Sequence, residues 1–362
     1  MKDKITAIGI MSGTSLDALD IAFCEFIYDG KRWDFDFQTT TSIPYGKAWK
    51  KKLNDAPSFE PEKLLELDKK YGKWIGEKVA QFIKDHDLEP NLIASHGHTI
   101  FHTPQNGYSL QIGDGANIAA LTKLVTVADF RNADIAYGGE GAPLAPTGDE
   151  FLFSEHKYCL NIGGFCNISY KDNNKRIAFD IVPANYALNE LADQLGLNYD
   201  NKGRNASLGK FHQELYNELN NLEFYKKTPP KSLGREWYEN NFKPIIEKYN
   251  NINIRDKLRT VTEHIAYQIK NAIPFQNNKD SLLITGGGAF NNFLIQRIKE
   301  MNSFKVKIPK EEIIEYKEAL IFAFLGVLRV NEQINCFSSV TGARQNSCSG
   351  VVHKGGVDRS LG

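Results

Sequence analysis

The 362-residue sequence lacks a surplus of either charge: 44 lysines and arginines stand against 44 aspartates and glutamates, so the formal net charge is zero. Proteins dedicated to nucleic acids usually carry a basic excess, so we expect no nucleic-acid partner. Glycine (29) and proline (13) are no more frequent than in ordinary globular chains, which excludes collagenous and low-complexity classes. With 41% hydrophobic and 24% charged residues, the chain is long enough for about two folded domains.

Long hydrophobic runs are also missing. The longest, residues 319–328, is about half of the roughly 20 residues that span a bilayer. The apolar run near the start is broken at Ser12-Gly13 and is too short for a secretory signal. The five cysteines form no CxxC pair and are odd in number, which favours free thiols in a reducing compartment. We therefore expect a cytoplasmic protein that does not enter membranes.

The same order of expected elements occurs twice along the chain. In the first copy, residue patterns predict strands at 4–10, 18–28 and 33–41, a helix at 61–86, a strand at 91–95, a helix near 116–121 and a strand at 124–128. In the second copy they predict strands at 158–162, 166–170 and 176–180, helices at 186–195, 210–220 and 256–272, a strand at 281–285 and a helix after Asn291. This duplication predicts two α/β domains, residues 1–136 and 137–362, with a cleft between them and a hinge region near 138–146. The C-terminal helix and tail are candidates to pack back on the first domain.

Three glycine-rich turns follow predicted strands. The first contains Gly9, Ser12, Gly13, Thr14, Ser15 and Asp17, the second Gly163 and Gly164, and the third Gly286, Gly287, Gly288 and Asn291. Backbone N–H groups and hydroxyls in such turns can hold phosphate oxygens, although no Walker A sequence is present. The alternatives are an ordinary hairpin turn for the first and a crowded strand-to-helix turn for the third, and the second turn is a weak signal by itself. The paired positions of the first two turns favour a nucleotide held from both sides.

Several acidic residues are candidates for chemistry. Asp180 ends a predicted strand, where a carboxylate can act as a general base, although it could instead cap the following helix. Asp17 and Asp20 could contact Mg²⁺ through water or simply cap a turn. Glu140 lies in the glycine-rich hinge.

Basic residues form a second group of candidates. His96 and His98 would share one face of a strand, but Gly97 and the lack of further ligands nearby favour a polar, substrate-facing strand end over a zinc site. Arg131 could bind a carboxylate in a bidentate manner or form a surface ion pair. Residues 229–236 suggest an exposed connector that could border the cleft.

Together these strings resemble the anhydro-N-acetylmuramic acid kinases of the sugar-kinase/Hsp70/actin superfamily. The matching strings, in order, are MSGTSLD at 11–17, SHG at 95–97 with Thr99, LQIGD at 110–114, VADFR at 127–131, GEGAPL at 139–144, NIGG at 161–164, AFD at 178–180, PKS at 230–232, GRE at 234–236, GGGA at 286–289 with Asn291, KEA at 317–319 and SVTGA at 339–343. The order of so many short strings is far more specific than any one of them.

The resemblance implies two RNase H-like domains around an ATP cleft, and a homodimer. It implies an ATP-dependent reaction in which water opens the 1,6-anhydro bond of anhydro-N-acetylmuramic acid and O6 receives a phosphoryl group, giving N-acetylmuramic acid 6-phosphate for cell-wall recycling. On this pattern Asp180 is the base, and the three glycine-rich turns hold ATP and Mg²⁺. The residues that it places near the sugar are His96, Thr99, Arg131, Glu140 and Glu318.

Some positions depart from the family's usual pattern. Ile181 replaces a threonine, Val182-Pro183-Ala184-Asn185 replaces Gly-Pro-Gly-Asn, and His98 replaces a frequent glutamine. The usual acidic, glycine-rich stretch is present in altered form at residues 200–206. These departures keep open a kinase of the same fold for another anhydro or amino sugar. A further alternative is a non-catalytic module that binds nucleotide or sugar.

Overall fold

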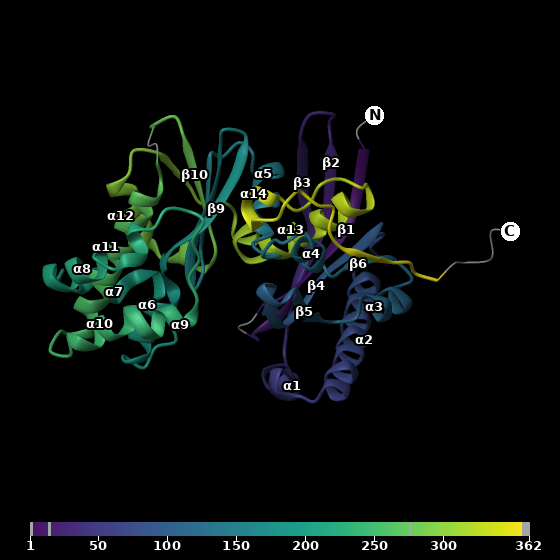
Figure 1. The fold of residues 1–362 in the computed structure, drawn as a ribbon, viewed down its shortest axis with the longest axis horizontal. Coiled ribbons are helices and arrows are strands. Elements are labelled where there is room, and N and C mark those ends of the chain that lie inside the picture. Colours follow the sequence, from purple (N-terminus) through teal and green to yellow (C-terminus); the bar gives the residue numbers. More distant parts are fainter. Residues whose placement is uncertain (1–2, 14–15, 275–276, 357–362) are drawn as a thin grey trace. The chain divides into compact units, whose positions relative to one another are not determined.

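The computed structural model describes residues 3–13, 16–274 and 277–356, which form two compact units (Figure 1). The first unit consists of two segments, the residues up to Leu152 and those from Tyr316 onward. The second unit consists of Phe153 to Glu315. Residue 136, after which the sequence predicts a domain boundary, lies inside the first unit. The C-terminal segment belongs to this first unit as well.

The first unit is built on one mixed sheet. Its strands are β1 (Asp3–Ser12), β2 (Ala18–Tyr28), β3 (Trp33–Pro44), β4 (Leu92–Thr103), β5 (Tyr108–Ile112), β6 (Val125–Ala128) and β12 (Val351–His353). The order is β12-β6-β4-β1-β2-β3, with β5 paired to β4. Strands β1, β2 and β3, all three predicted, form an antiparallel meander, whereas β4 and β6 run parallel to β1. The carboxyl ends of β1, β4 and β6 therefore meet at one edge of the sheet.

Helices cover both faces of this sheet. They are α1 (Lys47–Asp55), α2 (Pro61–Asp85), α3 (Gly115–Thr122), α4 (Asn132–Ala136), α5 (Ala145–Phe151), α13 (Glu311–Val330, from Tyr316 onward) and α14 (Ser338–Thr341). On one face, Ile8 and Ile10 of β1 pack in a core with α1, α2 and α3. On the other face, Gly9 lies under α13, where a Cβ atom would come within 1.8 Å of the Ala319 carbonyl oxygen.

The apolar run at residues 319–328 is thus part of α13, and nearly all of its side chains are buried. No helix in the described part of the chain is both long and apolar enough to cross a membrane.

The second unit repeats the topology of the first. Its strands are β7 (Tyr158–Ile162), β8 (Phe165–Asp172), β9 (Lys175–Pro183), β10 (Ser281–Thr285) and β11 (Lys305–Lys307), in the order β11-β10-β7-β8-β9. Again the first three strands are antiparallel and the next two run parallel to the first of them. The predicted duplication of an α/β fold is confirmed.

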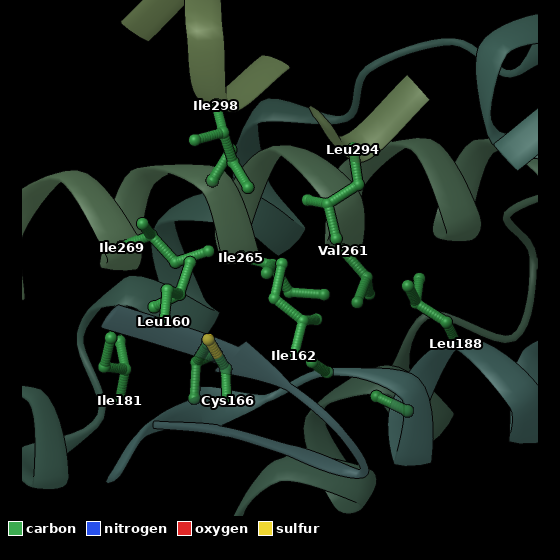
Figure 2. Close-up of a cluster of buried hydrophobic side chains, with 14 of the residues drawn as sticks. Leu160, Ile162, Cys166, Ile181, Leu188, Val261, Ile265, Ile269, Leu294 and Ile298 are labelled. Carbon is green, nitrogen blue, oxygen red and sulfur yellow. The ribbon is translucent and has the colours of Figure 1, made fainter. Parts of the chain in front are cut away.

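The helices of the second unit pack on one face of its sheet. They are α6 (Asn185–Asp193), α7 (Arg204–Leu208), α8 (Gln213–Asn220), α9 (Arg235–Trp237), α10 (Lys243–Lys248), α11 (Ile254–Ala272) and α12 (Asn292–Met301). Figure 2 shows the core, in which Val261, Ile265 and Ile269 of α11 point toward the sheet residues Leu160 and Cys166. Each turn of α11 thus supplies an apolar side chain at helical spacing.

The structure also differs from the predicted elements. The strand expected at 91–95 continues as β4 to Thr103, because Gly97 takes a φ of +73° that lets the strand continue past an irregularity. Strand β5 was not predicted, although its sequence, YSLQI at 108–112, alternates apolar and polar residues as a strand does.

Candidate active site

A buried chain of hydroxyl groups supports the first glycine-rich turn. Ser12, at the end of β1, lies 3.0 Å from Nδ1 of His98 and accepts a hydrogen bond of 2.8 Å from the Tyr45 hydroxyl. Tyr45 in turn is hydrogen-bonded to Tyr71 of α2. The Ser12 hydroxyl thus has two hydrogen-bond partners inside the protein, Tyr45 and His98. These hydrogen bonds hold Ser12, and with it the start of the glycine-rich turn, in place.

The predicted nucleotide residues of this turn differ in position. Gly13 is partly exposed, whereas Gly9 is buried beneath α13, so that packing explains its lack of a side chain. Thr14 and Ser15 lie outside the described residues.

The acidic pair beside the turn suits a magnesium ion held through water. Asp17 is exposed, and Asp20 of β2 accepts a hydrogen bond of 2.5 Å from Ser42. Partial burial raises the pKa of Asp20, and the nearby carboxylate of Asp17 raises it further. A cation would relieve this repulsion, and Mg²⁺ commonly binds through one or two carboxylates, waters and substrate phosphates. Among the described residues no group of three or more potential ligands could enclose a metal by itself.

His96 and Arg131 form a paired unit at the carboxyl edge of the first sheet. The Nε and Nη2 atoms of Arg131 lie 3.1 and 2.8 Å from Nε2 of His96, and Nη1 donates to the Gly141 carbonyl at 2.8 Å. Nδ1 of His96 lies 3.0 Å from the Gly97 carbonyl, so it carries the proton. Burial, followed by the Arg131 charge, lowers the pKa of His96 to about 3. The imidazole is therefore neutral and holds the guanidinium in place.

The two histidines do not converge on a common ligand. An extra residue in β4 between the partners of Ile10 and Ser12 separates them in register, and Gly97 lies at this irregularity. His96 thus bonds Arg131, while His98 bonds Ser12. The two rings therefore have different hydrogen-bond partners.

The remaining sugar candidates are Thr99, Glu140 and Glu318. Thr99 accepts a long hydrogen bond of 3.3 Å from Gln111. Glu140 is exposed, and its backbone N–H donates to the Thr341 carbonyl at 2.8 Å. Glu318 of α13 is exposed and has no hydrogen bond to another described residue; its charge favours the protonated Arg131. These side chains keep polar atoms free for a ligand.

A buried carboxylate, which sequence reasoning missed, holds the loop that carries Glu140. Asp134 is fully buried and accepts hydrogen bonds of 2.8 Å from the Gly141 N–H and from the Thr341 hydroxyl. A Cβ atom on Gly139 would come within 2.2 Å of this carboxylate. The loop therefore closes tightly around Asp134, and its Gly141 carbonyl is thereby presented to Arg131.

In the second unit, the structure brings the other two glycine-rich turns together. They follow the parallel neighbours β7 and β10. Asn185 links them: its N–H donates to the Gly163 carbonyl at 3.1 Å, its side-chain amide donates to Ile162 at 3.2 Å, and that amide is the nearest group to a Cβ on Gly287, at 3.6 Å. Ligands of α/β sheets commonly bind outside the carboxyl ends of such strands. Asn185 was not predicted as a site residue, although it is the asparagine of the altered Gly-Pro-Gly-Asn segment.

The three consecutive positions of the third turn are glycine for different reasons. Gly286 has a φ of +78° and would press a Cβ within 2.6 Å of Asn161, and Gly288 would place one 2.2 Å from Ile162. Gly287 is exposed and has room, as have Gly163 and Gly164. The close packing explains two glycines, while the third leaves open backbone for a ligand.

Asn291 has a structural contact of its own. Its side-chain oxygen accepts a hydrogen bond of 3.0 Å from the N–H of Leu294 and so caps α12.

Asp180 lies on β9, the edge strand of the second sheet. Cys166 pairs with Val182 but Asn167 pairs with Asp180, so Ile181 is an extra, bulged residue. Such bulges re-aim the side chain beside them. Oδ2 of Asp180 accepts a hydrogen bond of 2.8 Å from the Leu233 N–H, and Oδ1 has no partner within the described ranges. Partial burial raises the pKa of this carboxyl, which the Leu233 hydrogen bond partly offsets.

The fold and these groups together define a class of protein. The chain has two units of duplicated RNase H-like topology, with glycine-rich turns at the carboxyl ends of parallel strands and an available carboxylate on an edge strand. This is the architecture of the sugar-kinase/Hsp70/actin superfamily.

Comparisons with known proteins identify the family. The anhydro-N-acetylmuramic acid kinase family profile matches residues 5–355. An anhydro-N-acetylmuramic acid kinase of Hydrogenovibrio crunogenus is 35% identical, covering 95% of this chain and 97% of the relative. Those of Caldanaerobacter subterraneus and Francisella tularensis are each 34% identical, covering 97% and 98% of this chain and 97% and 100% of the relative. The chain belongs to the anhydro-N-acetylmuramic acid kinase family.

Solved structures also match over most of the chain. A ligand-bound xylulose kinase from Lactobacillus acidophilus matches with a TM-score of 0.44 and 11% identity, covering 97% of this chain and 94% of that one. Component A of the (R)-2-hydroxyglutaryl-CoA dehydratase of Acidaminococcus fermentans matches with a TM-score of 0.44 and 12% identity, covering 88% and 96%.

Proposed function

We propose that this protein is an ATP-dependent kinase that opens 1,6-anhydro-N-acetylmuramic acid with water and phosphorylates O6, giving N-acetylmuramic acid 6-phosphate. Water attacks the anomeric carbon and the C1–O6 bond breaks. The released O6 takes the γ-phosphoryl group of ATP, and ADP leaves. Asp180 accepts the proton of the attacking water.

The surroundings of Asp180 support this proposal most directly. One carboxylate oxygen is held by a backbone N–H and the other is available as an acceptor, which suits a base that must receive a proton from water. Burial raises the pKa of this carboxyl above that of an ordinary aspartate, which makes the carboxylate a stronger base.

We assign the remaining roles to residues of both units. Gly13, Gly163, Gly164 and Gly287 are proposed to contact ATP through open backbone. Thr14 and Ser15 are proposed as further ATP contacts on the family resemblance. Asp17 and Asp20 would hold Mg²⁺, whose charge would offset that of the phosphates. The residues proposed to bind the sugar are His96, Thr99, Arg131, Glu140 and Glu318. Gly9, Ser12, Gly286, Gly288 and Asn291 act by shaping the turns.

Several departures from the family pattern have a structural role and so do not by themselves indicate another substrate. Ile181, Val182 and Ala184 all belong to the buried core of the second unit. His98 is hydrogen-bonded to Ser12, and Asp200 accepts hydrogen bonds from the first residues of α7. Each of these five residues thus has a structural partner.

The test is an assay of ADP release with anhydro-N-acetylmuramic acid, comparing the wild type with Asp180→Asn. Removal of a general base is expected to lower kcat by 10²–10⁴-fold, while ATP binding measured by calorimetry stays within about twofold. Asp172→Asn, an exposed substitution on neighbouring β8, is the control. Undiminished turnover in Asp180→Asn would refute the assignment, and ATP binding without a phosphorylated sugar would favour a non-catalytic module.

We also propose that the enzyme works in the cytoplasm as a homodimer, as the family resemblance implies. Light scattering coupled to gel filtration is expected to give twice the 40.8 kDa chain mass.

A further inference from the structure

A segment distant in sequence covers the edge strand that carries the base. Residues 229–233 run beside β9, and the N–H of Asp180 donates to the Lys231 carbonyl at 3.1 Å. Two residues further on, the Leu233 N–H donates to Oδ2 of Asp180 at 2.8 Å. The segment thus holds one residue by both its backbone and its carboxylate.

The Lys231 side chain fixes this segment to the second unit. Its ammonium group lies 4.7 Å from the ring centre of Phe224 and 5.9 Å from that of Phe179, and it donates a hydrogen bond of 3.4 Å to the Phe224 carbonyl. Phe224 is itself buried, and its ring lies 5.2 Å from that of Trp237. A cation held over aromatic rings gives the segment a defined position.

The carboxylate of Asp180 has little else to orient it. Its other oxygen is unpartnered within the described ranges, and the bulge at Ile181 removes one regular strand pair beside it. Without the segment, the side chain could rotate between rotamers. Rotation would move the accepting oxygen away from the water that it must deprotonate, and such misplacement is costly in catalysis.

We propose that residues 229–233 form a positioning clamp for the base, in which the Leu233 N–H orients the Asp180 carboxylate and Lys231 anchors the segment. This inference rests on the proposed function. The clamp acts through Asp180, and Leu233 is a positioning residue that need not touch substrate.

The experiment removes the Leu233 N–H alone. Leu233 is replaced by its α-hydroxy acid, which converts the amide to an ester and keeps the side chain; Leu233→Pro is a second variant without this N–H. Loss of a hydrogen bond to a carboxylate raises its pKa, so the acidic limb of kcat/KM for the sugar is expected to move up by about one pH unit. On the plateau, kcat is expected to fall about tenfold, with KM for ATP unchanged.

Matched variants separate the clamp from simple loss of stability. Leu233→Ala keeps the N–H and is expected to keep the wild-type acidic limb. Lys231→Met removes the charge but retains chain length, and is expected to lower kcat while Lys231→Arg restores most of it. An ester variant with the wild-type limb and kcat would overturn the clamp. Absence of sugar turnover in the wild type would instead refute the proposed function, so the two failures differ.

Discussion

Two histidines, His96 in the first unit and His264 in the second, are neutral mainly because they are buried. His264 is fully buried in α11; its Nδ1 lies 2.8 Å from the Asn220 side-chain oxygen and its Nε2 3.0 Å from the Tyr225 hydroxyl. Burial lowers its pKa to about 3, as it does for His96. Both rings make a full set of hydrogen bonds as neutral imidazoles, so a second proton has no acceptor nearby.

The pH dependence of stability should report His264 directly. Between pH 6.5 and about 3 the unfolded chain binds a proton that the native ring refuses, so the free energy of unfolding falls as pH falls. Each such histidine contributes a slope of about 1.4 kcal/mol per pH unit. In urea unfolding between pH 6 and 5, His264→Gln is expected to have a slope shallower by about this amount.

The matched control for this prediction is His86→Gln, at the exposed end of α2. It makes the same change of side chain outside the core. A slope in His264→Gln equal to that of the wild type would mean that this ring is protonated in the native state.

At the level of elements, neighbouring glycines of the turn after β10 are expected to have different roles: Gly288 packs against the core, whereas Gly287 is open to a ligand. Gly288→Ala places a methyl group 2.2 Å from Ile162 and is expected to cost about 1–3 kcal/mol of stability by overpacking. Gly287→Ala finds its nearest neighbour at 3.6 Å, so stability should change by less than about 0.5 kcal/mol. Because Gly287 is proposed to contact ATP, the KM of the Gly287→Ala variant for ATP should rise about tenfold, while its KM for the sugar stays constant.

Thermal unfolding and initial-rate kinetics on both variants test this contrast. The reverse outcome, with Gly287→Ala unstable and Gly288→Ala impaired only toward ATP, would contradict the assignment of the two glycines.

The same turn shows what sequence can and cannot predict. Local patterns correctly predicted the first three strands of each unit, the long helix α2 and the turns that follow β7 and β10. They could not predict which of the three glycines pack against the core and which is open to a ligand. This depends on Ile162, which is more than 120 residues away in the sequence. Likewise, the hydrogen bond from Leu233 to Asp180 spans 53 residues and carries no local periodicity. Contacts between distant segments decide which residues of a motif face a ligand.

The bulge in β9 gives a second prediction for an element. Ile181 replaces the threonine usual in the family, and its side chain lies in the core beside Cys166 (Figure 2). Ile181→Thr buries a hydroxyl and removes apolar volume, so it is expected to cost about 2 kcal/mol in urea unfolding. The kcat/KM for anhydro-N-acetylmuramic acid should stay within twofold. A tenfold change would mean that this position selects the sugar, and Ile181→Val, which keeps an apolar side chain, is the control.

For the whole molecule, the two copies of the fold differ in chain continuity. The second unit uses one stretch, residues 153–315, whereas the first needs α13 from the C-terminal part of the chain. In that unit the ring of Phe324 lies 5.4 Å from Phe26 and 5.3 Å from Trp33, and Gly326 packs on Ala94. This helix covers one face of the first sheet, so the unit is incomplete without it.

Fragments should therefore behave unequally. Residues 153–315 produced alone are expected to unfold in one cooperative urea transition, because their core is formed within that stretch. Residues 1–152 alone should not, since losing a single buried phenylalanine costs about 3–5 kcal/mol and losing all of α13 exceeds the stability of a typical domain. Adding residues 316–362 as a separate peptide should restore a cooperative transition, and the same peptide with Phe324→Ala should restore less. Cooperative folding of residues 1–152 without the peptide would show that α13 is an accessory to this sheet rather than part of its core.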